Sequence, residues 1–159
     1  MVELVPMEQE DFETYRESNI REYAAEHVKN GDWLPEEALE KSRKEVQGLL
    51  PDGIKSKNQF IYSIFDDATN QKLGMLWVEV KMDTPRRRAF MYDFIIEEQF
   101  RGKGYGKQAL AALDQKLISM DSESVGLHVF AHNTVAQELY KKSGYQVTNI
   151  IMRKQLKPQ

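Results

Sequence analysis

The 159-residue sequence predicts a single α/β domain. Apolar residues recur at helical spacing in the first third, alternate as in strands in the middle, and return to helical and then strand spacing toward the C-terminus. No repeat, linker or low-complexity tract divides the chain, and a domain of this length buries roughly 70% of its unfolded surface. We therefore treat residues 1–159 as one domain.

The first third predicts a strand followed by two helices. Residues 2–5 form an apolar run that Pro6 closes. The first helix ends where Asn30 and Gly31 supply the residues typical of a helix stop. Pro35 suits the first position of a second helix, which Pro51 ends. The helical spacing of these two segments is carried by Phe12, Tyr15, Tyr23, Ala24, Val28, Leu39, Val46 and Leu50.

The middle of the chain predicts three consecutive antiparallel strands. Apolar runs cover residues 60–65, 73–80 and 89–96. Residues 66–71 and 83–85, which separate these runs, are rich in turn-forming residues. Short turns between strands favour a meander, in which each strand pairs with the next.

The last third predicts a helix, a strand, a second helix and a final strand. Leucines at helical spacing indicate a helix over residues 104–120, and an apolar run indicates a strand over 125–131. Thr134 and Gln137 form the pattern of a capping box for the next helix, which Gly144 ends. We expect the last strand over residues 145–156.

Composition excludes several functional classes. The chain contains no cysteine, which excludes disulfides, thiolate metal sites and cysteine nucleophiles and favours the cytoplasm. Its net charge of −3 argues against nucleic-acid binding. No apolar stretch is long enough for a membrane span, and the N-terminal residues lack the basic segment of a signal peptide.

The segment from Phe100 to Lys107 is the strongest functional signal. Three glycines alternate there with bulky residues, just before a helix, so backbone N–H groups and the helix dipole can hold an anion among basic side chains. A glycine-rich turn with solvated basic residues is the simpler alternative. The spacing Gly104-x-Gly106-x-x-Ala109 also matches a dinucleotide fingerprint, with Asp121 and Glu123 as candidate ribose partners, but a strand that closes a meander should not open a βαβ unit.

Two motifs resemble the GCN5-related N-acetyltransferase (GNAT) family. Arg101-x-x-Gly104-x-Gly106 is similar to that family's pyrophosphate loop. Residues 128–133, followed by Ala136, Leu139, Tyr140, Gly144 and Tyr145, resemble its second motif. The similarity that includes these motifs spans residues 89–156. The N-terminal half resembles the family only in the order of its helices and strands. The resemblance implies a mixed, mostly antiparallel sheet with helices on both faces, in the order β-α-α-β-β-β-α-β-α-β.

The resemblance implies acetyl-coenzyme A as the acyl donor, while the residues themselves indicate no metal site, as the histidine spacing below shows. The pantetheine of this donor would lie along the strand at Phe94, Ile95 and Ile96. Asn133 would meet the pantetheine arm or serve as an ordinary N-cap. The pyrophosphate would be held by the loop residues Arg101, Gly102, Lys103, Gly104, Tyr105, Gly106 and Lys107.

Acetylation of an amine requires a base, an oxyanion site and an acid for the departing thiolate. By resemblance, Tyr140 is the acid, or else an amphipathic tyrosine in the packing. The base is His128, Asp93 or a water chain between them: an imidazole titrates in the useful range, and apolar neighbours should raise the pKa of a lone carboxyl. A structural role for His128 fits equally. His128 and His132 do not converge on a metal in an extended segment.

The acceptor is expected to be a primary amine on a small molecule or a protein. Candidates for its lining are Tyr23, His27, Trp33 and Trp77, each of which could also belong to the core. Acidic residues in the first helices would suit a cationic amine such as a polyamine, a lysine or an N-terminus. A nucleotide-cofactor oxidoreductase and a non-catalytic acyl-coenzyme A sensor are the alternative functions, and a homodimer through sheet edges or the C-terminal strands is expected.

Overall fold

The computed structural model describes residues 1–158 and contains one five-stranded sheet whose strands follow each other in chain order. The first four strands pair antiparallel, and the middle three of the chain form the predicted meander. The fifth strand pairs parallel with the fourth. The sheet is therefore mixed and mostly antiparallel, which confirms the predicted class. The strands are β1 (Val2–Pro6), β2 (Gln59–Asp66), β3 (Lys72–Val80), β4 (Arg88–Ile96) and β5 (Ser124–Leu127).

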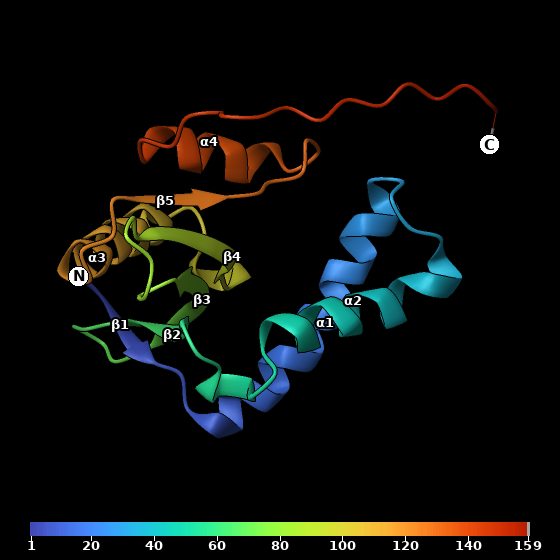
Figure 1. Cartoon of the computed structure of the whole chain (residues 1–159). Coiled ribbons are helices and arrows are strands. Elements are labelled where there is room, and N and C mark those ends of the chain that lie inside the picture. Colours follow the sequence, from blue (N-terminus) through green and yellow to red (C-terminus); the bar gives the residue numbers. More distant parts are fainter. Residues whose placement is uncertain (159) are drawn as a thin grey trace.

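Helices cover both faces of the sheet (Figure 1). The first two form an antiparallel pair on one face. The third, which follows β4 and precedes β5 in the chain, packs on the other face, where it contacts β1 and β4. Within residues 1–158, no helix combines the length and apolar character that crossing a membrane requires. The helices are α1 (Gln9–Lys29), α2 (Pro35–Leu49), α3 (Tyr105–Ser119) and α4 (Thr134–Lys142), with short 3₁₀ turns at Gly53–Lys55 and Glu98–Phe100.

Two apolar clusters hold these layers together. Leu76 on β3 packs with Leu110 and Leu113 of α3 on one face, whereas its neighbour Trp77 packs with Phe12 and other residues of α1 and α2 on the opposite face. This follows from the alternation of side chains along a strand. Each fully buried side chain of this size contributes roughly 1.5–3 kcal/mol. The packing fixes β3 and β4 between the two helical layers.

The C-terminal third departs from the sequence expectations in three places. The strand expected over residues 125–131 ends at Leu127, because β4 is its only neighbour and diverges there. The cap of α4 is Asn133, whose side chain accepts the N–H of Ala136, and Thr134 is already helical, so the predicted capping box is wrong. The strand expected over residues 145–156 is absent, because these residues have no pairing partner within residues 1–158.

Candidate active site

A β-bulge in β4 aims two neighbouring side chains at the same helices. Trp77 on β3 pairs with Asp93, but the next pair is Val78 with Met91, so Tyr92 is an extra residue. Strict alternation would send Tyr92 and Asp93 to opposite faces. The bulge instead places both on the side of α1 and α2, where Tyr92 packs against the cluster around Trp77.

Asp93 is held from α1. Its Oδ2 accepts hydrogen bonds from the Tyr15 hydroxyl at 2.7 Å and from Asn19 Nδ2 at 2.9 Å, and its Oδ1 accepts the N–H of Phe94 at 2.9 Å. Burial raises the pKa of Asp93 above its usual value, although the three hydrogen bonds act in the opposite direction. The Asp93 carboxyl is therefore fixed in place by α1 and by its own strand, with a pKa above the ordinary value.

The sequence reasoning missed Tyr15 as a polar contact and missed Asn19 altogether. Both lie on one face of α1, four residues apart, a spacing that lets two side chains reach the same group. That spacing was the available signal. The sequence could not show that Tyr15 and Asn19 bind Asp93. The bulge that turns Asp93 toward α1 leaves no trace in the alternation of apolar and polar residues along β4.

The strands β4 and β5 separate beside the bulge. Their ladder ends at the pair Met91 and Leu127, while β4 continues to Ile96. On the side facing away from β3, the backbone of Phe94, Ile95 and Ile96 has no strand partner within residues 1–158. Unpaired edge groups of this kind can bind an extended ligand by strand addition.

The loop after β4 presents free N–H groups. Gly102 and Gly104 adopt the left-handed region, with φ of 76° and 84°, which favours glycine. The first bond of α3 runs from the Gln108 N–H to the Gly104 carbonyl, and in the described chain the N–H groups of residues 102–107 donate no hydrogen bond. With exposed Lys103 and Lys107 and the positive end of the helix dipole, the loop fits an anion such as a pyrophosphate.

Two side chains of the loop point elsewhere. Arg101 donates from Nε to the Ile96 carbonyl at 2.8 Å, so its guanidinium turns back along β4. The Tyr105 hydroxyl donates to Asp66 on β2 at 3.2 Å. For Tyr105, only the backbone N–H remains available to an anion at the loop.

Gly106 serves close packing. A Cβ at this position would lie 3.0 Å from Leu139 on α4. The glycine therefore lets the start of α3 approach α4. The opening between the unpaired end of β4 and α4 is called the cleft below.

Tyr140 lies on the α4 side of the cleft. Its ring is half-buried, 6.5 Å from the ring of Phe94 and 5.6 Å from that of Tyr145. Burial, followed by the charge of Asp93, raises the pKa of Tyr140 to about 12. Within residues 1–158 its hydroxyl makes no hydrogen bond. A protonated phenol and the Asp93 carboxyl thus lie within electrostatic reach of each other across the cleft.

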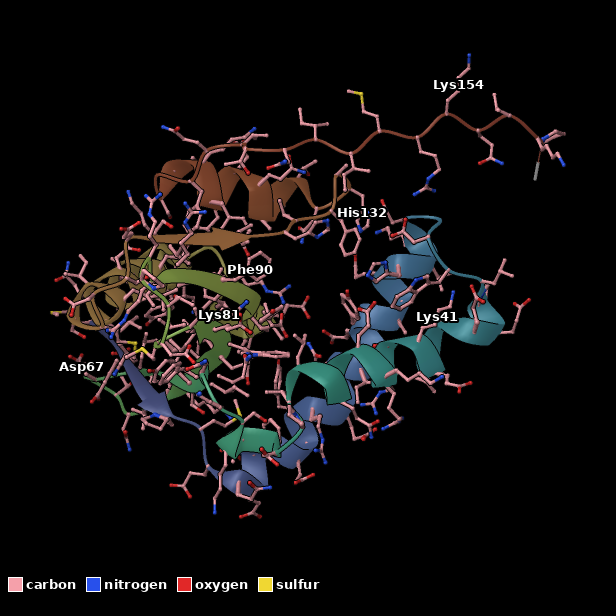
Figure 2. The ribbon with its side chains drawn as sticks, in the orientation of Figure 1. Lys41, Asp67, Lys81, Phe90, His132 and Lys154 are labelled. Carbon is pink, nitrogen blue, oxygen red and sulfur yellow. The ribbon has the colours of Figure 1, made fainter. Side chains whose placement is uncertain are left out.

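The extended residues 128–132 face α1. His128, Phe130 and His132 share one side of this segment, where Phe130 contacts both histidine rings. Phe130 also meets His27 edge-on at 5.1 Å, and His132 pairs with Glu26 of α1. Figure 2 shows His132 between the segment before α4 and the end of α1. The His128 side chain is exposed to solvent.

Asn133 begins α4. Its Oδ1 accepts the Ala136 N–H at 3.4 Å, so the structural role that the sequence allowed is present. A contact with pantetheine would use the side-chain amide group and stays a prediction.

A cavity of about 410 Å³ adjoins Asp93. Asn19, which binds Asp93, belongs to its wall, as does Tyr92. Of the four expected lining residues, Tyr23 and Trp77 do line it, whereas His27 and Trp33 stack on each other at 4.0 Å and are not part of its wall. The full lining is Asn19, Tyr23, Glu45, Val46, Gly48, Leu49, Trp77 and Tyr92.

The cavity combines aromatic faces with negative charge. Burial, followed by a hydrogen bond to Glu45, raises the pKa of Tyr23, which keeps its phenol neutral. Glu22 nearby has a pKa raised by burial and then by the charges of Asp93 and Glu26. The wall itself contributes one carboxylate, that of Glu45, and a carboxylate among aromatic rings suits a cation.

The expectation that no βαβ unit begins at this loop is wrong. β4, α3 and β5 form such a unit with parallel strands, although β4 also closes the meander. The candidate acidic partners, however, lie elsewhere: Asp121 and Glu123 precede β5, beside the start of β4, and Glu123 pairs with Arg86 at 3.0 Å. The loop follows the opposite end of β4. In residues 1–158 there is also no group of three metal-binding side chains.

The comparisons with known proteins identify the family. The model of the Acetyltransferase (GNAT) family matches residues 10–145, and the chain therefore belongs to this family of acetyltransferases. It is 43% identical over 155 residues to the uncharacterized N-acetyltransferase YycN of Bacillus subtilis (strain 168), covering 96% of this chain and 97% of that protein.

Two further similarities are informative. The crystal structure of YycN from Bacillus subtilis superposes with a TM-score of 0.94 at 41% identity, covering 99% of this chain and 100% of that one. A shorter match, 35% identical over 72 residues, links 45% of this chain to 47% of the spermine/spermidine N(1)-acetyltransferase of Bacillus subtilis (strain 168).

Proposed function

We propose that the chain transfers an acetyl group from acetyl-coenzyme A directly to a primary amine, with both substrates bound together. The amine nitrogen forms the new C–N bond, the thioester C–S bond breaks, and the amine proton and the thiolate are handled by groups of the cleft. The family membership supports the donor, since GNAT acetyltransferases generally use acetyl-coenzyme A. The absence of cysteine in the sequence favours direct transfer over a thioester on the enzyme.

The observation that carries the proposal is the continuous path from the unpaired edge of β4 to the loop at residues 101–107. Phe94, Ile95 and Ile96 would pair with the amides of pantetheine, and the free N–H groups of the loop would hold the pyrophosphate. Arg101, Lys103 and Lys107 add positive charge to a chain of net negative charge. Asn133 would close the path at α4.

We assign the acid to Tyr140 and the base to Asp93, with exposed His128 as the alternative base. Asp93 borders the cavity through Asn19, and burial has already raised the pKa of the carboxyl, which improves it as a proton acceptor. Tyr140 keeps its proton at neutral pH because its pKa is raised to about 12, so it can donate to the departing thiolate. Water can connect either base to the amine.

We propose that the cavity of about 410 Å³ binds the acceptor as an alkylammonium ion. Tyr23, Trp77 and Tyr92 offer ring faces, and Glu45 offers a carboxylate. The similarity to a spermine/spermidine N(1)-acetyltransferase makes polyamines the first amines to test. A lysine or an N-terminal amine would present the same charge.

We further propose that the chain acts as one domain in the cytoplasm, as a homodimer that binds neither nucleic acid nor membranes. The absence of cysteine supports the compartment, and the net charge of −3 supports the exclusion of nucleic acid. The family match over residues 10–145 supports one domain.

The donor site is tested by calorimetric titration of the whole chain with acetyl-coenzyme A, coenzyme A and NADH. We expect micromolar binding of both coenzyme A ligands, and Lys107→Glu should weaken it about tenfold, equivalent to about 1.4 kcal/mol. Lys44→Glu, an exposed lysine on α2, is the matched control and should change nothing. Binding of NADH alone would overturn the proposal.

The acceptor site is tested by release of free thiol from acetyl-coenzyme A. The chain has no cysteine of its own, so a thiol reagent reports only the product. Spermidine, spermine, a lysine peptide and neutral amides form the panel. Glu45→Gln should raise the KM of the best amine about tenfold, while Glu40→Gln on the same helix should not. Tight donor binding with no thiol release from any amine would instead indicate a sensor.

A further inference from the structure

An open groove adjoins the acceptor cavity along β4. Its volume is about 540 Å³, and its floor is formed by the first residues of β4 and β5. Tyr92 belongs to the wall of the cavity and to that of the groove, so the groove begins where the cavity ends. Within residues 1–158, neither α1 nor α2 contributes a residue to the groove, so this part of the sheet is uncovered. No step of the proposed reaction uses it.

The groove is positively charged in a chain of net charge −3. Three cationic side chains, Lys81, Arg86 and Arg88, line it beside one carboxylate, Glu79, and we call it the basic groove. Arg86 pairs with Glu123 at 3.0 Å, and Lys81 lies 4.0 Å from Glu79. Arg88 is exposed, and within residues 1–158 its side chain makes no hydrogen bond or ion pair. Its guanidinium group can therefore bind a carboxylate through two parallel N–H donors.

Aromatic rings connect the basic groove to the cavity. The ring of Trp77, in the cavity wall, lies 4.8 Å from that of Tyr92, and the ring of Tyr92 lies 4.9 Å from that of Phe90 in the groove. Gly126 of β5 stands opposite Phe90 and has no side chain to cover this ring. The row of rings is thus a continuous apolar surface between the two sites.

The charges at the two ends of this surface are opposite and far apart. The cavity offers the carboxylate of Glu45, and the groove offers the guanidinium of Arg88. Arg88 precedes Asp93 by five residues on β4, which corresponds to roughly 16 Å of strand. A free amino acid carries its ammonium and carboxylate groups on one carbon atom, which is too close to reach both ends. A polyamine would bring a second cation toward Arg88, whereas a peptide can span the distance and carry both charges.

We propose that the acceptor is an acidic peptide, an inference that rests on the proposed transfer of acetyl to an amine in the cavity. The reactive amine enters the cavity beside Asp93, the peptide crosses the rings of Tyr92 and Phe90, and a carboxylate a few residues away binds Arg88. The basic groove selects the substrate through binding and takes no part in the chemical step. Acetylation removes the charge of the amine and its attraction to Glu45, which favours release of the product.

The first test measures binding without any acetyl transfer. Two capped peptides of equal length carry one central lysine each, and they differ only in having glutamate or glutamine about four residues from it on each side. Calorimetric titration should give a dissociation constant about tenfold lower for the glutamate peptide. Arg88→Gln should abolish this difference. Arg21→Gln, which changes an exposed arginine on α1 outside both the cavity and the groove, is the matched control and should preserve it. Equal binding of the two peptides, binding of neither, or loss of the difference in both variants would overturn the proposal.

Thiol release from acetyl-coenzyme A separates this proposal from the proposed function. The KM of the glutamate peptide should be about tenfold lower than that of the glutamine peptide, because the groove contributes binding. Equal KM values, with both peptides acetylated, would overturn the acidic-peptide proposal and leave the acetyl transfer standing. Selective binding of the glutamate peptide with no thiol release would overturn the transfer and leave the groove assignment standing.

A second variant fills the basic groove. A Cβ at Gly126 would lie 3.8 Å from the ring of Phe90, which is an ordinary contact, and valine suits a strand, so β5 accepts the new side chain. Gly126→Val should raise the dissociation constant of the glutamate peptide about tenfold, while the thermal unfolding temperature stays close to that of the wild type. Unchanged affinity in the folded variant would place the peptide elsewhere and contradict the proposal.

Discussion

On one wall of the cleft, Asp93 of β4 lies between two helical layers and accepts three hydrogen bonds, two of them from side chains of α1. On the other wall, residues 128–140 contain no buried residue and lean on α1 through Phe130, His27 and the pair of His132 with Glu26. The groups proposed for proton transfer therefore sit on supports of very different rigidity. The wall of β4 is pre-organised within one chain, whereas the wall of α4 depends on contacts from outside its own layer.

The two walls meet different physical requirements. A carboxyl with a raised pKa must be held firmly, because burial of a charge is costly unless its partners stay in place. The facing wall has to admit a long ligand between β4 and β5, so it can be joined to the body more loosely. The following variants probe the two walls, in order of expected effect.

Tyr140→Phe removes the proposed proton donor, the hydroxyl, from the wall of α4 and leaves the aromatic ring in place. We expect kcat to fall about 100-fold or more, with the KM for acetyl-coenzyme A nearly unchanged, since general acid catalysis contributes roughly 10²–10⁴-fold. Steady-state thiol release measures both. Tyr145→Phe, an adjacent half-buried phenol, is the control and should keep kcat. Equal rates for Tyr140→Phe and wild type would remove Tyr140 from the mechanism.

Leu76→Ala and Leu139→Ala compare the packing behind the two walls. Leu76 on β3, the strand that pairs with β4, is fully buried, so its truncation should lower the free energy of unfolding by about 2–5 kcal/mol. Leu139 on α4 is only half-buried, and its truncation should cost less than half as much. Urea unfolding at one protein concentration gives both values. Similar losses would mean that the wall of α4 is as well packed as the core.

Asp93→Asn tests how much the buried charge of Asp93, on the wall of β4, destabilises the folded protein. A carboxyl whose pKa is raised in the folded protein stabilises the fold while protonated, at pH below its unfolded value of 3.8, and that contribution is lost as the pH rises through the raised pKa. The free energy of unfolding of wild type minus that of Asp93→Asn should therefore decrease as the pH rises above 3.8. Urea unfolding at a series of pH values measures this difference. A difference that increases with pH would show that the hydrogen bonds outweigh burial.

Glu26→Gln should have the smallest effect. It breaks the pair with His132 that joins the wall of α4 to α1. Because both side chains are partly exposed, we expect the free energy of unfolding to fall by less than about 1 kcal/mol. Thermal unfolding at low and high salt provides the measurement, with exposed Glu10→Gln on α1 as the control. A loss of several kcal/mol would mean that this pair is a main support of the wall of α4.

Local signals in the sequence predicted most of the fold. Pro35 marks the start of α2, and Gly31, which adopts the left-handed region, follows the end of α1. The three middle strands appear where the alternation placed them, and the glycines before α3 gave the loop with free N–H groups. These features depend on a few neighbouring residues, so one sequence is enough to read them.

The position of Asp93 could not be predicted from the sequence. It depends on the bulge at Tyr92, which arises from how β4 registers against β3, and on Tyr15 and Asn19, which are more than seventy residues away along the chain. The cavity next to Asp93 has the same origin, because its wall combines α1, α2, β3 and β4. Only the packed layers bring such distant residues together.

The sequence by itself determined most of the helices and strands and the glycine-rich loop before α3, because backbone preference and hydrophobic periodicity are local properties. It also determined the family, through the spacing of the loop glycines and the residues around Tyr140. Only the tertiary structure decided that residues 146–158 have no strand partner within residues 1–158, although their composition is that of a strand. A strand exists only when its hydrogen bonds find a partner, and the presence of a partner is a property of the assembled molecule.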